Sequence, residues 1–486
     1  MRNISRLTSF GLVVFLLFPF VFLILKLNAI SIVDHEEVSW ALKNSTLQAA
    51  GSASLALILG FIFFSGIVKI KEILGIKIFR WIEILCLIPG MLPSLFTILI
   101  LMSLIHPFPM GLKGIILIHG IIYSGFIALN IYQLVQDKAQ SLVEVAYILG
   151  ASRTQIFVQI FRLLKWELIS LWILIFSICF TSFAVPLTVG GGWGTTLEVL
   201  IFEKIRLSAA WSQALSLALL QSVLLFLFSF IQRPGAALEV GRYSQVPILG
   251  GFTSGLLLIF SLLAYYGTFL LYSFRGWTQF FQLSEIVGST LQTVPQTLIV
   301  GVSCGAMIYM MLNLTAFGWK QKWLRRFLIG FVAPSTSLAG LIVVLLRPDY
   351  FWMQIGFFTL AFVTIVFGGL YRMGFDQRLT SLKMQIEVAQ VLGAHHWLIF
   401  REVIWPQIHP MAARLAGIAS LWMVGDFALS RVIFSQDIVL AQVVQGLINS
   451  YHLDIGMAVM NVVILIGLAL YFLFEGFGRV FSYKTP

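Results

Sequence analysis

The 486-residue sequence has few charged residues and few cysteines. Charged residues make up only 10% of the chain, whereas soluble domains carry roughly 25%. A water-soluble protein with so little charge could not cover its surface, so the soluble globular classes are excluded. The three cysteines, Cys86, Cys179 and Cys304, lie far apart within apolar runs. This spacing excludes a Cys-x-x-C pair and a disulfide framework, and we interpret the cysteines as small buried side chains.

Catalytic and metal-binding motifs are missing as well. The sequence contains no Gly-Lys dipeptide and therefore no Walker A phosphate loop, and it has no His-Glu-x-x-His motif. The histidines are scattered, without the spacing of metal ligands. We therefore expect this chain to have no catalytic residue, no metal site and no cofactor.

Long apolar runs dominate what is present. Hydrophobic residues make up 59% of the chain, and the mean hydropathy is +0.97. A membrane-spanning helix needs about 20 apolar residues, whereas strands of a membrane barrel alternate in polarity over about 10. Because the runs are continuous, the sequence predicts an all-α polytopic membrane protein with about 12 transmembrane helices. The predicted spans are 10–27, 47–68, 81–104, 115–134, 168–188, 211–231, 250–273, 293–314, 327–346, 352–370, 415–434 and 457–474.

The distribution of positive charge predicts the orientation. If the N-terminus is cytoplasmic, most of the 31 lysine and arginine residues fall in cytoplasmic segments, as membrane insertion favours. We therefore expect both termini to be cytoplasmic. The first run is too long for a signal peptide and has no cleavage pattern after it, so we interpret it as an uncleaved span. The net charge of +11 would suggest a nucleic-acid partner in a soluble protein. Here the positive charge collects on the cytoplasmic side, as membrane insertion favours, so no nucleic-acid partner is expected.

Two long cytoplasmic connections, about 135–167 and about 371–414, carry the same motif. The first contains Glu144-Val-Ala-Tyr-Ile-Leu-Gly150-Ala, and the second contains Glu387-Val-Ala-Gln-Val-Leu-Gly393-Ala. The two glutamates lie half a chain length apart. The sequence therefore predicts a tandem duplication into two six-helix halves, residues 1–242 and 243–486.

The motif itself predicts a helix, a tight turn and a second helix. Ala146 and Ala389 are small enough to let another surface approach, and Gly150 and Gly393 allow a left-handed turn that ends one helix and starts the next. Such a projecting knuckle suits docking to a cytoplasmic partner. The alternative is an amphipathic helix that lies on the lipid.

Glu-x-Ala-x-x-x-Gly at this position resembles the EAA loop of permeases from binding-protein-dependent ABC importers. The resemblance implies a type I permease in a bacterial cytoplasmic membrane, two cytoplasmic ATPase subunits that hydrolyse ATP, an extracytoplasmic substrate-binding protein and a small-molecule substrate. The family's later proline is present as Pro406, but Leu163 takes its place in the first loop, and Val145 and Val388 replace the usual alanine. The coupling residues implied are Glu144, Ala146, Gly150, Ala151, Glu387, Ala389, Gly393, Ala394 and Pro406.

Within this family, residues 182–202 and Gly425-Asp426-Phe-Ala resemble the thiamine-type permease. The resemblance implies thiamine or a thiamine phosphate as substrate, with the related ferric-iron permeases as the alternative. A rival class, the ion-coupled secondary transporter, would need several titratable groups near the membrane midplane. Asp426 is the only acid predicted well inside a span, so this rival is less favoured.

Asp426 is the first candidate for the translocation path. A carboxylate in lipid is costly and normally faces a cavity or a partner. It could line the path beside Trp422, whose ring would attract a cation, or it could form a structural bond to a neighbouring helix. Aligned by the phenylalanine that follows each, its counterpart is Ser182.

A glycine-rich segment on the predicted outer side is the second candidate. Gly190, Gly191, Gly192, Thr195 and Thr196 surround Trp193 just after the fifth predicted span. These residues offer tight turns, amides and hydroxyls without charge. The segment is either an outer gate or docking turn for the binding protein, or a flexible connection.

Overall fold

In a computed structural model of the chain, the structure describes residues 2–26, 34–229, 249–330, 336–346, 350–434 and 436–482. Within these ranges the regular elements are helices, and none is a strand. Helices satisfy their own backbone hydrogen bonds, as lipid requires. The predicted all-α polytopic class is confirmed.

The elements before residue 230 form an N-terminal group. Its helices are α1 (Arg2–Lys26), α2 (His35–Met91), α3 (Ser94–Leu104), α4 (Leu112–Lys138), α5 (Gln140–Ile148), α6 (Arg153–Phe180), α7 (Ala184–Val189), α8 (Leu197–Arg206) and α9 (Trp211–Ser229). The long helix α2 is broken at Gly75, where φ is +74°.

The elements after residue 249 form a C-terminal group. Its α-helices are α10 (Phe252–Phe280), α11 (Ser284–Phe317), α12 (Lys322–Gly330), α13 (Thr336–Leu346), α14 (Phe351–Leu370), α15 (Asp376–Ser381), α16 (Lys383–Val391), α17 (His396–Ile399), α18 (Trp405–Val424), α19 (Ala428–Ile433), α20 (Leu440–Asn449) and α21 (Leu453–Ser482). Two π-helical turns, Tyr371–Phe375 and Phe400–Ile404, interrupt the series.

The predicted count of twelve spans is not confirmed. Among the described residues, eight helices are long and apolar enough to cross a membrane. A ninth span results if the second limb of α2 and α3, which meet at an angle of 101°, count as one broken span. Other predicted spans are divided: 168–188 becomes the end of α6 plus α7, and 415–434 becomes α18 plus α19. Hydropathy does not reveal these breaks, because the runs around them stay apolar on average although Ser182 and Asp426 lie at two of them.

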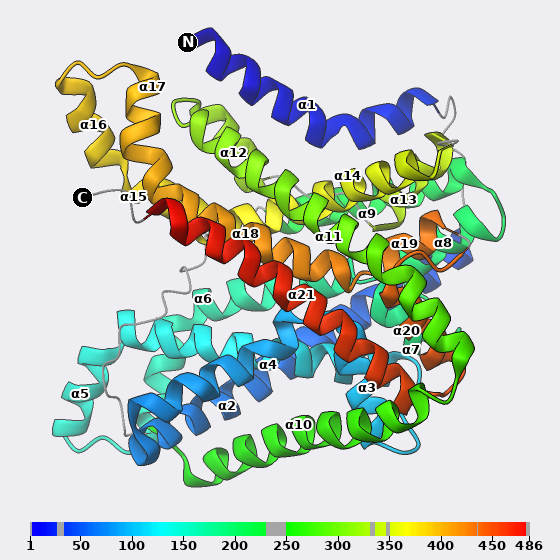
Figure 1. The fold of residues 1–486 in the computed structure, drawn as a ribbon. Helices are drawn as coiled ribbons and strands as arrows, with labels where there is room; N and C mark the ends of the chain where they lie inside the picture. The colour runs from blue at the N-terminus through cyan, green and yellow to red at the C-terminus, as the bar shows by residue number, and fades with distance from the viewer. Residues whose placement is uncertain are drawn as a thin grey trace.

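The first helix of each group packs against helices of the other group. Leu12 and Leu16 of α1 are buried in the apolar core that α11, α14 and α18 build. Conversely, α10 lies along α2 and α3, where Tyr266 Oη donates to the carbonyl of Leu85 at 2.7 Å and Tyr272 Oη to that of Ser103 at 3.0 Å. Figure 1 shows α1 crossing beside α12 and α14, and α10 running under α2 and α4.

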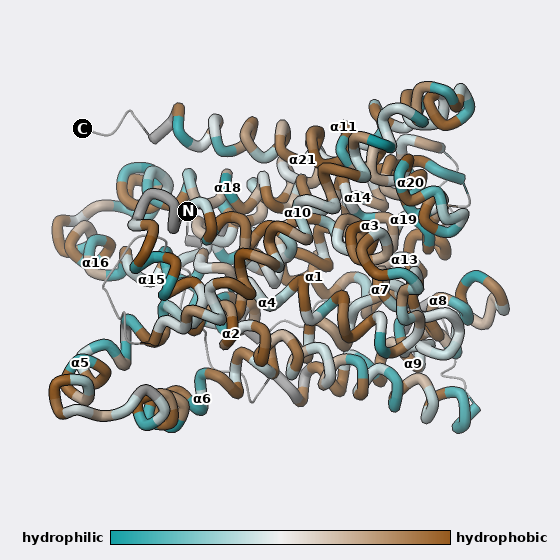
Figure 2. The backbone as a smooth tube through the Cα atoms, turned by 90° about the horizontal axis from the view of Figure 1, so that it is seen from below, coloured by the Kyte–Doolittle hydropathy of each residue, from teal (hydrophilic) through white to brown (hydrophobic). Residues whose placement is uncertain are grey.

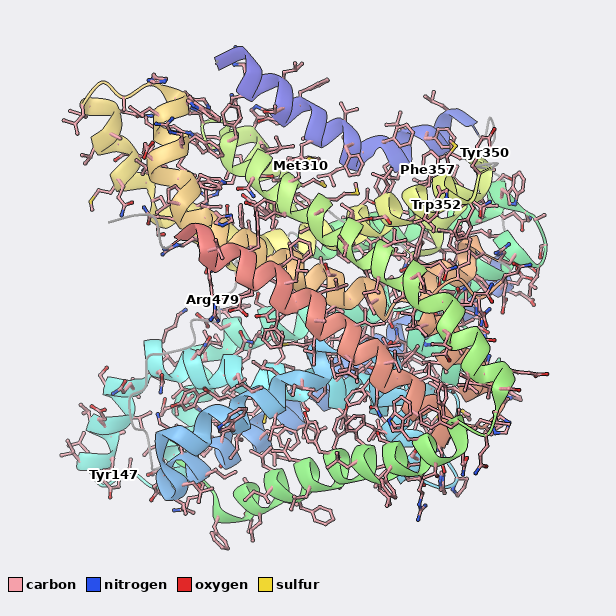
Figure 3. The ribbon with its side chains drawn as sticks, in the orientation of Figure 1. Tyr147, Met310, Tyr350, Trp352, Phe357 and Arg479 are labelled. Atoms are coloured by element: carbon pink, nitrogen blue, oxygen red, sulfur yellow. The ribbon has the colours of Figure 1, made fainter. Side chains whose placement is uncertain are left out.

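The molecule has two distinct ends. In Figures 1 and 2, α5 and α16 lie at one end, with the start of α1 and the end of α21, whereas α8 and α20 lie at the other. In Figure 2 hydrophobic residues predominate along the middle of the helices. The exposed aromatic rings of Tyr350 and Trp352 lie near the α8 end, and Tyr147 projects from α5 at the opposite end (Figure 3).

Candidate functional site

The first EAA-like segment forms a surface knuckle, here called the first knuckle (residues 140–152). Helix α5 ends at a turn in which Gly150 has φ of +78°. The N–H of Ala151 donates to the carbonyl of Ala146 at 3.0 Å, which closes the wide hydrogen-bonded ring of a glycine C-cap. A β-carbon on Gly150 would meet nothing within 4 Å, so it is the backbone angle, not crowding, that calls for glycine.

The second EAA-like segment repeats this geometry in the second knuckle (residues 383–395). Gly393 has φ of +80°, and the N–H of Ala394 donates to the carbonyl of Ala389 at 3.0 Å. A β-carbon on Gly393 would likewise meet nothing within 4 Å. The helix–glycine–helix shape predicted from the repeated motif is confirmed at both places.

The tips of both knuckles expose large apolar side chains. Ile148 and Leu149 are 82% and 80% exposed, and Val391 and Leu392 are 88% and 81% exposed. The opposite face of each short helix is anchored: Val143 and Ile386 are buried, and the four motif alanines are half-buried against the cores. Each knuckle is thus fixed on one side and presents an uncovered apolar tip on the other.

The two motif glutamates lie on exposed faces but have different neighbours. Gln140 Nε2 donates to Glu144 Oε1 at 2.8 Å, beside a polar pocket of about 240 Å³ that Gln136, Lys138 and Ser141 also line. Glu387 Oε1 lies 3.7 Å from Lys383 Nζ. The first glutamate is therefore held by a neutral amide and the second by a cation.

Pro406 lies in the first turn of α18, directly after a π-helical turn. The N–H of Trp405 reaches back five residues to the carbonyl of Phe400, instead of the four of an α-helix. In the first half of the chain Leu163 lies inside the unbroken helix α6. The departure from the family pattern at Leu163 therefore coincides with a difference in helix geometry.

The glycine-rich segment forms a compact turn at the end opposite the knuckles. Gly191 and Gly192 have φ of +57° and +76°, and the N–H of Gly194 donates to the carbonyl of Gly190 at 2.9 Å. Trp193 between them is 80% exposed.

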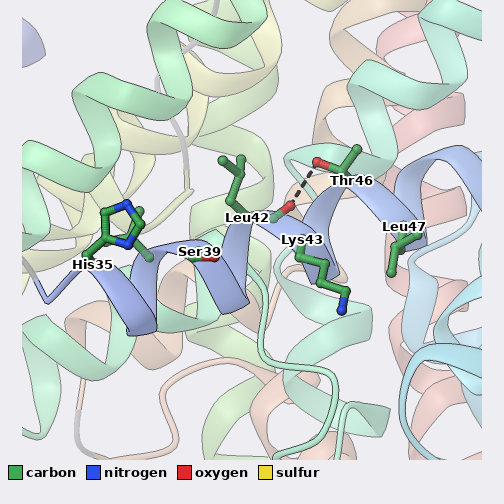
Figure 4. A pocket seen from close by; sticks show the side chains of 7 residues that line it. His35, Ser39, Leu42, Lys43, Thr46 and Leu47 are labelled. Carbon is green, nitrogen blue, oxygen red and sulfur yellow. Dashed lines mark hydrogen bonds between the residues drawn. The ribbon is translucent and has the colours of Figure 1, made fainter.

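Helix α2 holds this turn in place. Asn44 Nδ2 donates to the carbonyl of Thr195 at 3.1 Å, and Ser45 Oγ accepts from the N–H of Leu197 at 2.8 Å. Thr196 is fully buried. On α2 nearby, an open pocket of about 510 Å³ is lined by seven residues of one helix face (Figure 4). The turn is a fixed platform around an exposed tryptophan.

The structure corrects the position of Asp426. This residue lies in the break between α18 and α19, not inside a spanning helix. Its Oδ2 accepts from the N–H of Leu429 at 3.0 Å, so the carboxylate caps the short helix α19. Asp426 was expected either to line the translocation path or to bond to a neighbouring helix. The hydrogen bond that the structure describes for its carboxylate is a structural one, but it is made to α19, the helix that follows Asp426 in the chain.

The break beside Asp426 packs against the break between α2 and α3. Trp422 Nε1 donates to the carbonyl of Met91 at 3.0 Å. A β-carbon on Gly425 would lie 1.7 Å from Pro93 Cγ, so only glycine fits there. Residues from both groups of helices thus meet at this point, and Trp422 uses its indole N–H to join them.

Ser182 occupies the matching break between α6 and α7. Its Oγ lies 2.9 Å from Nε2 of His119, a buried residue of α4. Sequence reasoning treated His119 as one of several scattered histidines. His119 and Ser182 are 63 residues apart in the sequence, so no local motif could predict that their side chains meet.

Sequence reasoning also missed Glu198, a fully buried acid in α8. Its carboxylate accepts from Gln221 Nε2 at 3.2 Å and from the N–H of Ser337 at 3.4 Å, and Ser337 Oγ donates to the Glu198 carbonyl at 3.1 Å. Glu198 therefore ties the N-terminal group to α13. An acid just after the glycine-rich segment was the available signal.

The apolar helices and the bundle they form define a polytopic helical membrane protein. Residues 297–485, which include the second knuckle, match the family model described as the binding-protein-dependent transport system inner membrane component. The chain is also 27% identical over 165 residues to the putrescine transport system permease protein PotI of Escherichia coli strain K12 and to that of Escherichia coli O6:H1.

These alignments cover 33% of this chain and 59% of each relative. No solved structure matches the chain significantly. The matches support a permease of a binding-protein-dependent ABC system. They give no support to thiamine or ferric iron, because the relatives are named for putrescine.

Proposed function

We propose that this chain is the membrane-spanning permease subunit of an ABC importer. Two separate cytoplasmic ATPase subunits bind the knuckles, and their ATP-driven closure rocks the helix groups between two packings. The observation that carries the proposal is the family match over residues 297–485, which include the second knuckle. The first knuckle lies outside this match, but it has the same glycine-capped geometry and the same exposed apolar tip, so the proposal extends to both knuckles. The chain itself is not an enzyme.

The proposed organisation is a fused pair of six-helix halves, residues 1–242 and 243–486, in a bacterial inner membrane. The end that carries both knuckles faces the cytoplasm, with the two chain termini. This orientation is supported by the lysine and arginine distribution and by the common position of α5, α16, the start of α1 and the end of α21 (Figure 1). The glycine-rich turn with Trp193 then faces outward, where a substrate-binding protein docks.

The proposed cargo is a small organic cation. Residues 182–202 and 425–428 resemble the thiamine-type permease, which favours thiamine or a thiamine phosphate, and the relatives' name favours a diamine. Asp426 and the ring of Trp422, at the break after α18, suit a cationic solute better than an anionic one.

The docking claim is tested by charge reversal at the two motif glutamates. The chain is co-purified with candidate ATPase subunits as wild type, as Glu144→Lys and as Glu387→Lys. Each variant is expected to retain less ATPase than wild type, and the double variant is expected to retain none. Lys165→Glu, an exposed charge outside both knuckles, is the matched control. Undiminished ATPase in the double variant would overturn the docking claim.

The cargo claim is tested by uptake. Cells without their own transporters express the chain with its ATPase and binding protein, and accumulation of labelled thiamine, putrescine and ferric iron is compared. Uptake of thiamine or putrescine that stops when ATP is depleted supports the organic cation. Uptake of ferric iron alone would overturn it.

A further inference from the structure

The second knuckle is bounded on its first side by a break in the backbone. Between α14 and α15 the π-turn Tyr371–Phe375 contains Met373 with ψ of +41° and Gly374 with φ of +98°. Gly374 lies in the left-handed region that favours glycine. The helix therefore changes direction just before the knuckle, and it does so outside α-helical geometry.

The other side of the second knuckle has a second break. The π-turn Phe400–Ile404 separates the short helix α17 from α18, and Pro406 follows it. π-turns of this kind are local departures from the α-helix that recur at functional sites. The segment 376–399 thus lies between two interruptions.

The first knuckle has no such interruptions on either side. Helix α4 runs without a break from Leu112 to Lys138, and α6 runs without a break from Arg153 to Phe180. Lys138 and Glu167 form an ion pair between these two helices. A continuous helix transmits a displacement along its axis, whereas a segment between two π-turns can tilt.

One side-chain cluster spans the first interruption. Arg325 of α12 donates from Nε to Asp376 Oδ1 at 2.6 Å and from Nη2 to Oδ2 at 2.8 Å. Tyr371 Oη donates to the same Oδ1 at 2.9 Å. Asp376 is the first residue of α15, so this two-pronged pair attaches the start of the segment 376–399, which carries the second knuckle, to α12.

The environment of this cluster makes it stronger than an ordinary surface pair. The Asp376 side chain is only 16% exposed, and Tyr371 is fully buried. The hydrogen bond to Asp376 raises the pKa of Arg325 above its usual value. Bidentate arginine–carboxylate pairs fix geometry as well as adding energy. Half a chain earlier, Ile82 and Gln133 stand at the positions of Arg325 and Asp376, so the first knuckle lacks this pair.

We propose that Asp376 is a positioning residue for the coupling step: with Arg325 and Tyr371 it latches the second knuckle against α12 at one angle between its two π-turns. This inference rests on the proposed docking of ATPase to the knuckles. Without the latch, the second knuckle still binds the ATPase, but its angle to α12 varies. A smaller part of the ATP-driven displacement is then transmitted to α18.

The first experiment measures the angle on the chain alone, in lipid nanodiscs without ATPase. Spin labels at Lys322→Cys and Val391→Cys report the distance from α12 to the second tip, and labels at Ile73→Cys and Leu149→Cys report the first knuckle. The three native cysteines are buried, so they are expected to react little with the spin label. Labelling of the chain without added cysteines measures this background. Latch variants are Asp376→Asn, Tyr371→Phe and the swap of Arg325→Asp with Asp376→Arg. Glu167→Gln is the matched variant of the first knuckle.

Asp376→Asn is expected to lower the equilibrium constant for the latched state at least roughly tenfold, the effect of losing a charge-assisted hydrogen bond, and to widen the second distance distribution. Tyr371→Phe is expected to widen the second distance distribution less. The swap of Arg325→Asp with Asp376→Arg is expected to return this distribution to a narrow width. Glu167→Gln is expected to leave the first distribution narrow. A second distribution that stays narrow in both Asp376→Asn and Tyr371→Phe would overturn the latch. Equal widening in Glu167→Gln would overturn the role of the π-turns.

The second experiment measures coupling in the complex with ATPase. Asp376→Asn is expected to keep ATPase bound while the solute moved per ATP falls, and the swap is expected to restore that ratio. An unchanged ratio would overturn the positioning role. If wild type binds no ATPase, the proposed function fails instead, and the distance measurement still stands by itself.

Discussion

In the first knuckle, Ser152 caps α6 and the helix then continues unbroken to Phe180. In the second, no side chain caps α17, and a π-turn and Pro406 follow before α18. Yet the two glycine turns and the two apolar tips are nearly the same. The two knuckles therefore offer a partner nearly the same surface, but they are attached to the membrane helices in different ways.

The largest expected effect comes from giving α6, the helix after the first knuckle, the proline that α18 has after the second knuckle. Leu163→Pro removes a helix hydrogen bond inside α6 and places a ring against the preceding turn, at a cost of about 3 kcal/mol. Hydrogen exchange around residues 157–163 and the unfolding temperature measure the loss. Leu163→Ala is the control, because this half-exposed side chain packs little. If Leu163→Pro is as stable as Leu163→Ala, α6 accepts a π-turn and the contrast between the attachments disappears.

A smaller effect tests what the knuckles share. Gly150→Ala and Gly393→Ala force alanine into the left-handed region, at about 1–2 kcal/mol each. Both should open faster in hydrogen exchange, and by similar amounts, because neither β-carbon meets a neighbour. Gly356→Ala in α14, where a β-carbon also meets nothing, is the control and should not destabilise. Unequal effects at the two turns would show that their geometry is not equivalent.

The cap of α6 sharpens the difference. Ser152 Oγ accepts from the N–H of Gln155, while Gln155 Oε1 accepts from the N–H of Ser152, a reciprocal capping box. Ser152→Ala should therefore cost about 1 kcal/mol in the first knuckle. His395→Ala should cost nothing measurable in the second, where the side chain makes no capping bond. Thermal unfolding of both variants checks this, and a loss of stability in His395→Ala would contradict it.

The smallest effect concerns the glutamate neighbours. Lys383→Ala removes an exposed pair to Glu387 and should cost about 0.3 kcal/mol, an effect that salt abolishes. Gln140→Ala removes a neutral hydrogen bond to Glu144, and its effect should not depend on salt. Hydrogen exchange of α5 and α16 at low and high salt distinguishes the two. Equal salt dependence would mean that the two glutamates have equivalent surroundings.

The sequence predicted best where geometry is local. Gly150 and Gly393 could be assigned to left-handed turns because the motif places them at the end of a short helix, and a single residue type decides that turn. The all-helical class followed from long apolar runs. The roles of the motif residues in docking stay predictions.

It predicted worst where distant segments meet. Asp426 is predicted inside a span because residues 415–434 are apolar on average, and the break beside it depends on the close approach of Gly425 to Pro93. Glu198 was passed over because its partner Ser337 lies 139 residues away. The pair Arg325 and Asp376, 51 residues apart, was missed for the same reason.

The exchange of first helices has a consequence for biosynthesis. Helix α1 leaves the ribosome well before the helices on which it packs, because Ser5 Oγ donates to the carbonyl of Phe317, 312 residues later, and Leu12 and Leu16 pack with helices of the second group. Until those residues are translated, α1 must wait in the bilayer with its future contact face uncovered. Completion of the fold therefore depends on late synthesis, and prematurely terminated chains would display an orphaned helix to membrane quality control.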